Sequence, residues 1–121
     1  MQNRLDEALA LNELGRIHRH LGDASAAVTH LERAQSLLQN GEVLEQAFNE
    51  RELGLCLSSL RDSAAEAHLR RAFDLYRASG ATDDLAATCK ALGDLYLAQG
   101  DTDRAVATLR EGLEYIELRS S

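Results

Sequence analysis

The sequence predicts an all-α protein made of repeated helix pairs, and three observations support this prediction. First, the 121 residues contain no proline, and alanine and leucine supply most of the apolar side chains, a composition that favours helices. Second, apolar residues recur at spacings of three and four along the chain, which is the period of an amphipathic helix. Third, the dipeptide Leu-Gly occurs three times at an interval of 39 residues, which indicates an internal repeat.

Each repeat unit has two parts separated by a short turn. In the first part an alanine precedes the Leu-Gly glycine by seven residues; these pairs are Ala8 and Gly15, Ala47 and Gly54, and Ala86 and Gly93. In the second part a small, a large and a small residue follow one another; they are Ala27, Leu31 and Ala34, then Ala65, Leu69 and Ala72, then Ala105, Leu109 and Gly112. We therefore expect one domain over 1–121, with units at about 4–41, 42–80 and 81–119.

These parts predict six helices, at about 4–21, 24–39, 43–60, 63–78, 83–98 and 102–118. Glycines that accept a left-handed backbone mark four expected helix ends; they are Gly22, Gly41, Gly80 and Gly100. Side-chain oxygens that can bind free amides mark four expected starts; they belong to Asp23, Asp62, Thr82 and Asp101. Ser63 and Glu66 have the spacing of a capping box.

The repeated positions resemble the tetratricopeptide repeat. In that family the first helix of a unit carries a large apolar residue, Leu-Gly and Tyr, and the second carries Ala, a large residue and Ala. The third unit shows the pattern with Leu92, Gly93 and Tyr96, followed by Ala105 and Leu109. The interval of 39 residues exceeds the family's usual period of about 34, and the closing proline is absent. The chain is therefore similar to the long-repeat subset found in bacterial signalling ATPases and transcriptional regulators.

The resemblance implies an α-solenoid in which the first helix of each unit lines a concave groove. Counting from each Leu-Gly places seven candidate partner-binding residues on this face: Asn12, Arg16, Arg19, Arg51, Leu55, Lys90 and Asp94. Asn12, Arg51 and Lys90 share one repeat position, so we expect a ladder whose basic members favour an acidic protein or peptide. The alternative is a solvated face on which Glu13, Glu52 and Asp94 neutralise the basic side chains.

Charge and motif content argue against several other functions. The net charge of −7 disfavours direct nucleic-acid binding, and no apolar run is long enough to span a membrane. The histidines and cysteines show no metal-ligand spacing, and no phosphate loop or nucleophile motif occurs, so we expect no catalytic residue, metal or cofactor. We expect Cys56 and Cys89 to be packing thiols in a reducing compartment, most simply the cytoplasm.

The ends of the array raise a second hypothesis, because a terminal repeat exposes one apolar face unless a polar cap covers it. Apolar residues of the last predicted helix form a candidate self-association face: Val106, Leu109, Leu113 and Ile116. The sequence thus favours a non-catalytic scaffold that binds a protein or peptide in bacterial signalling or regulation. The alternative is a self-associating segment, or part of a longer repeat array, without a peptide ligand.

Overall fold

The computed structural model describes residues 3–120, and every regular element in this range is an α-helix. The six helices are α1 (Asn3–His20), α2 (Ala24–Leu37), α3 (Val43–Ser59), α4 (Ala65–Ser79), α5 (Thr82–Ala98) and α6 (Thr102–Ser120). The all-α prediction is confirmed, and each helix begins and ends within two residues of its predicted bounds. Residues 1, 2 and 121, which the predicted domain includes, lie outside the described range.

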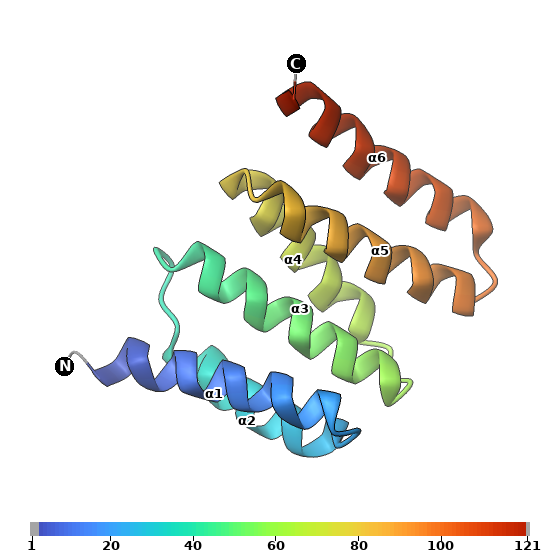
Figure 1. Cartoon of the computed structure of the whole chain (residues 1–121). Coiled ribbons are helices and arrows are strands. Elements are labelled where there is room, and N and C mark those ends of the chain that lie inside the picture. Colours follow the sequence, from blue (N-terminus) through green and yellow to red (C-terminus); the bar gives the residue numbers. More distant parts are fainter. Residues whose placement is uncertain (1–2, 121) are drawn as a thin grey trace.

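Helices that adjoin in sequence pack as antiparallel pairs, and the pairs stack on one another. Figure 1 shows α1, α3 and α5 side by side, with α2 and α4 behind them. Within residues 3–120, the extensive contacts between helices of different units join neighbouring units, as in an α-solenoid. The first helices of the three units therefore form one continuous layer, which is the layer that carries the candidate partner-binding residues.

The Leu-Gly glycines allow the two helices of a unit to approach closely. A Cβ atom added at Gly54 would lie 2.5 Å from Cγ of Leu69, and one added at Gly15 would meet a leucine of α2 at the same distance. Carbon atoms in favourable contact are about 3.5–4.0 Å apart, so only glycine fits at these two positions. At Gly93 the nearest atom, Cδ1 of Leu109, would be 3.4 Å away, so the third pair is packed less tightly there.

The core runs between the two helix layers. Its larger part extends from α3 to α6 and includes Phe73, Tyr76 and Leu92. Cys56 and Cys89 are both unpaired and buried, as expected for packing thiols. Burial, and to a lesser extent the nearby negative charge of a glutamate, raises the pKa of the Cys56 thiol to about 11, so it stays protonated at neutral pH.

Two of the four predicted side-chain caps form: Asp23 and Asp101 each accept a hydrogen bond from the backbone amide three residues later, both at 3.1 Å. The prediction for Asp62 is wrong, because its carboxylate accepts a hydrogen bond from the amide of Ala64 at 2.8 Å in the turn, whereas the cap position of α4 is Ala64 itself. The prediction for Thr82 is wrong, because Thr82 is the first helical residue and Ala81 holds the cap position without a side-chain bond. The carbonyl of Ala81 already accepts the first helical hydrogen bond, so α5 begins one residue earlier than predicted.

The predicted capping box is also wrong. α4 begins at Ala65, and Ala64 at its cap position makes no side-chain hydrogen bond. The carboxylate of Glu66 instead accepts a hydrogen bond from the hydroxyl of Tyr96 on α5, at 2.7 Å. The Glu66 side chain, which the local pattern assigned to the start of α4, is therefore used in a contact between neighbouring units.

Three of the four glycines predicted to end helices have a left-handed backbone; they are Gly22, Gly80 and Gly100, with φ between 75° and 83°. Gly41 does not end a helix. α2 already stops at Leu37, because the backbone of Leu38 is extended, with φ −80° and ψ 142°.

Arg61 occupies the turn position that Gly22 and Gly100 hold in the other units, and its backbone is left-handed with φ 57°. A side chain in this conformation costs about 1 kcal/mol, because Cβ crowds the following carbonyl. Arg61→Gly is therefore expected to raise the free energy of unfolding by about 1 kcal/mol in urea denaturation. Gly100→Arg, where an added Cβ meets only open space, should lower it similarly; no change in either variant would contradict the assignment of strain.

Candidate functional site

Six of the seven candidate partner-binding residues line one hollow on the layer of α1, α3 and α5. We call it the central hollow; it has a volume of about 440 Å³. Its lining residues are Arg16, Arg19, Arg51, Glu52, Leu55, Asp84, Ala87, Lys90, Ala91 and Asp94. Residues at equivalent positions of parallel helices face the same way, which is why counting from Leu-Gly brought these side chains together.

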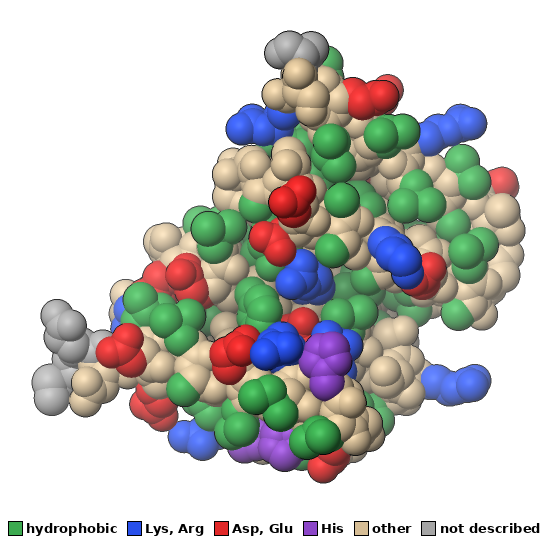
Figure 2. All heavy atoms as spheres, viewed as in Figure 1, with side chains coloured by type: hydrophobic (Ala, Val, Ile, Leu, Met, Phe, Trp, Pro, Cys, Tyr) green, Lys and Arg blue, Asp and Glu red, His purple; other side chains and the backbone are tan. Residues whose placement is uncertain are grey.

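Asn12 lies apart from the other six. It borders a smaller, more apolar hollow of about 260 Å³ between α1 and α3, together with Leu9, Leu44 and Phe48. Its side chain is only 3% exposed, and its Oδ1 accepts a hydrogen bond from Nδ2 of Asn49 at 2.8 Å. The expected ladder is thus divided: its basic members lie in the central hollow, whereas Asn12 joins α1 to α3. Figure 2 shows apolar, basic and acidic side chains side by side across this face of the molecule.

Every basic residue of the central hollow is paired with a carboxylate. The pairs are Arg16 with Glu13 at 3.0 Å, Arg19 with Glu52 at 2.7 Å, Arg51 with Asp84 at 3.2 Å, and Lys90 with Asp94 at 2.9 Å. The three neutralising acids expected from the sequence are all engaged, and Asp84 is a fourth that the sequence did not indicate. The lining therefore carries four basic and three acidic side chains and is close to neutral.

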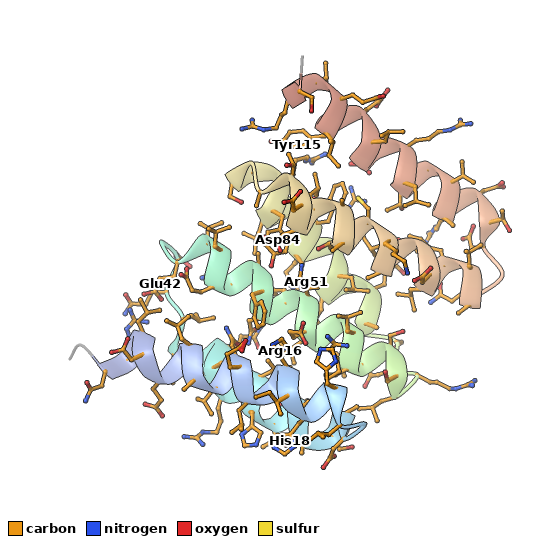
Figure 3. All side chains as sticks on the ribbon, viewed as in Figure 1. Arg16, His18, Glu42, Arg51, Asp84 and Tyr115 are labelled. Carbon is orange, nitrogen blue, oxygen red and sulfur yellow. The ribbon has the colours of Figure 1, made fainter. Side chains whose placement is uncertain are left out.

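Two of these pairs are built into the wall and link neighbouring helices. Glu52 of α3 is 2% exposed and is held by Arg19 of α1. Arg51 of α3 binds Asp84 of α5, and its guanidinium lies 5.3 Å from the ring centre of Tyr76, within reach of a cation–π contact. Figure 3 shows the side chains of Arg51 and Asp84 directed toward one another between α3 and α5. These pairs fix the spacing of the layer.

The other two pairs lie on the rim. Arg16 and Glu13 are one turn apart on α1, and Lys90 and Asp94 are one turn apart on α5. The hydrogen bond from Arg16 lowers the pKa of the Glu13 carboxyl, so this pair stays charged at neutral pH. Exposed pairs of this kind contribute little to stability, so both cations can exchange a carboxylate on their own helix for one on a partner.

The sequence did not indicate a polar cluster around the buried carboxylate of Glu50, which lies outside the central hollow. Oε1 of Glu50 lies 2.6 Å from Nδ1 of His68, and its other oxygen accepts a hydrogen bond from Nε of Arg71 at 2.8 Å. Burial raises the pKa of the Glu50 carboxyl, but the hydrogen bond from His68 and the charge of Arg71 outweigh burial and hold that pKa below its usual value. A signal was present: Glu50 stands at the repeat position of Leu11 and Cys89, and a buried carboxylate needs partners.

Two of the other histidines lie against each other, one on α1 and one on α2. The rings of His18 and His30 stack with their centres 5.1 Å apart. Within residues 3–120, no three or more His, Cys, Asp or Glu side chains are arranged to hold a metal ion. None of the helices in that range has the length and apolarity that crossing a lipid bilayer requires.

The stacked helix pairs and the hollow across their first helices define a helical-repeat protein of the α-solenoid class. The family model for the tetratricopeptide repeat matches residues 43–117, and a second model of the same description matches residues 4–37. The chain belongs to the tetratricopeptide repeat family, whose members generally mediate protein–protein interactions and are typically not enzymes. No curated protein matches the chain.

Proposed function

We propose that the central hollow binds a peptide or a segment of another protein, and that the chain acts as a non-catalytic scaffold. One observation carries the proposal: the first helices of three successive units bring six predicted side chains into a single open hollow. The resemblance to long-repeat arrays supports a place in bacterial signalling or regulation. The two unpaired thiols fit the reducing conditions of the cytoplasm.

The hollow is suited to binding because it is preformed. The ion pairs of Arg19 with Glu52 and of Arg51 with Asp84 each join two adjacent helices, so the walls are held in place before a partner arrives. A preorganised surface loses little conformational entropy on binding, which leaves more of the contact energy as affinity.

The lining suggests the chemistry of the partner. Leu55, Ala87 and Ala91 give an apolar strip between the rim cations Arg16 of α1 and Lys90 of α5. An extended or helical segment with small apolar side chains on one face, flanked by carboxylates, would satisfy both features. The binding of an acidic partner thus depends on the two rim cations, since Arg19 and Arg51 form ion pairs with Glu52 and Asp84 in the wall of the hollow.

Affinity capture from a native lysate tests this proposal. Arg16→Glu/Lys90→Glu reverses the rim charges, and Arg33→Glu/Arg110→Glu makes the same change in net charge at exposed positions outside the hollow. We expect a partner that wild type and the control variant retain and that binds the rim variant at least about tenfold more weakly. Circular dichroism verifies that all three proteins are folded. Equal capture by all three, or capture of nothing, would contradict binding at the hollow.

A further inference from the structure

The N-terminal end of the array exposes side chains at positions that are buried or partly buried where two units meet. Leu14 of α1 is 40% exposed, whereas its repeat counterparts Leu53 and Leu92 are 1% and 0% exposed. Ile17 is 46% exposed, and its counterpart Cys56 is 0% exposed. α1 therefore presents to solvent the face that α3 and α5 turn toward the preceding unit.

The C-terminal end shows the converse. Leu109 and Leu113 of α6 are 45% and 55% exposed, whereas their counterparts on α4, Leu69 and Phe73, are both 0% exposed. Leu69 and Phe73 belong to the same buried cluster as Leu92 of α5. α6 therefore exposes the face with which α4 holds the first helix of the next unit.

The two exposed faces match one another as the units inside the chain do. Between the first two units, Leu31 of the second helix shares a buried cluster with Leu53, the leucine of the following Leu-Gly. At the ends of the array, the same two repeat positions are filled by Leu109 and Leu14. An α1 helix seated on α6 would bury this pair as the internal contacts bury theirs.

The two ends of the array also carry opposite charges at the repeat positions that form an ion pair between units inside the chain. Inside the chain, Arg51 of α3 reaches Asp84 of α5 at 3.2 Å and ties two neighbouring units together. The counterpart of Arg51 in the last unit is Lys90, and the counterpart of Asp84 in the first unit is Asp6. Both are exposed, and a second copy with its α1 against α5 and α6 would bring its Asp6 to Lys90.

We propose that a second copy of this chain docks head to tail, with its α1 placed on α5 and α6 as α5 is placed on α3 and α4. The two faces differ, so the contact is heterologous, and each copy keeps one face for the next. Glu7 stands where Leu85 is buried in the third unit, so the contact between copies is weaker than the contacts within one. Lys90 belongs both to this contact and to the rim of the central hollow, whereas Leu14 and Leu113 lie outside the hollow, so substitutions at these two leucines test docking separately from partner binding.

Analytical ultracentrifugation of the 121-residue chain tests the proposal with two variants that each block one face, Leu14→Glu and Leu113→Glu. The mass of the wild type should rise with concentration from 13.3 kDa and pass twice that value. Each variant alone should remain at 13.3 kDa, because every copy then lacks one of the two faces that the contact needs. Their equimolar mixture should form a one-to-one heterodimer, because the intact α6 face of the first meets the intact α1 face of the second.

Matched controls are Leu21→Glu and Leu118→Glu, since both leucines are 75% exposed and their counterparts Leu60 and Ala78 stay exposed inside the array. Both controls should assemble like wild type. If a blocking variant loses helicity, Ile17→Glu and Leu109→Glu replace the pair.

Three results would overturn head-to-tail docking. A wild-type mass of 13.3 kDa at every concentration would show that copies do not dock, and that the end faces would have to be covered by a further repeat or by another protein. Dimers that survive Leu14→Glu but not Leu113→Glu would show that two α6 faces pair with each other. Assembly without a heterodimer in the mixture would show contacts elsewhere. All of these outcomes are measured on the purified chain without a partner protein, so none of them bears on partner binding at the central hollow.

Discussion

Replacing Gly54 with alanine is expected to lower the free energy of unfolding by about 2 kcal/mol, the range for overpacking a core. The added Cβ would lie 2.5 Å from Cγ of Leu69 and 3.1 Å from its backbone nitrogen. Leu69 is fully buried in the cluster that joins α3, α4 and α5, so it cannot move aside without disturbing that packing. Urea denaturation followed by circular dichroism measures the loss.

Gly93→Ala is the matched control, and its effect should have the opposite sign. There the added Cβ would make an ordinary 3.4 Å contact with Leu109, whose side chain is half-exposed and free to adjust. Alanine is favoured over glycine inside a helix by about 0.5–1 kcal/mol, so this variant should be more stable than wild type. A stabilising or neutral effect of Gly54→Ala would contradict the close approach of α3 and α4.

Arg19→Met is expected to destabilise the fold by about 3 kcal/mol, because breaking a buried ion pair leaves a charge without compensation. Nε of Arg19 lies 2.7 Å from Oε1 of Glu52, and the Glu52 side chain is 3% exposed. Methionine keeps the apolar stem of the arginine but removes the charge that neutralises this carboxylate. Equilibrium unfolding in urea gives the difference directly.

Two further variants separate the ion pair from general effects of losing an arginine. Arg16→Met breaks only an exposed pair on one helix and should change stability little. Arg19→Met/Glu52→Met removes both buried charges and should recover most of the lost stability. If Arg16→Met and Arg19→Met had equal effects, the pair of Arg19 with Glu52 would not be the link between α1 and α3.

The fold was largely predictable because its signals are local and periodic. Leu-Gly at one interval set the repeat, and the spacing of apolar residues set the helices to within two residues. One error falls where a contact between units overrides local preference: Glu66 bonds to Tyr96 of the next unit instead of capping its own helix. Another is a helix start, where Ala81 takes the cap position expected for Thr82 because α5 begins one residue earlier than predicted.

The candidate site was predictable in outline and not in detail. Repeat position alone brought six side chains into the central hollow, since equivalent residues of stacked helices share a face. Repeat position does not specify depth. Asn12 and Arg51 occupy equivalent repeat positions, yet Asn12 bonds to Asn49 inside the fold, whereas Arg51 bonds to Asp84 of α5. Such partners depend on the distance between helices, which a single sequence does not encode locally.

Site-specific photo-crosslinking in a native lysate tests the central claim, binding at the hollow, most directly. A photoreactive side chain at Ala87, which is exposed and lines the hollow, should form adducts with a distinct partner protein. The same group at Ala107, an exposed alanine of α6 outside the hollow, should not form them. Adducts at Ala107 and none at Ala87 would contradict the account and would move the binding surface away from α1, α3 and α5.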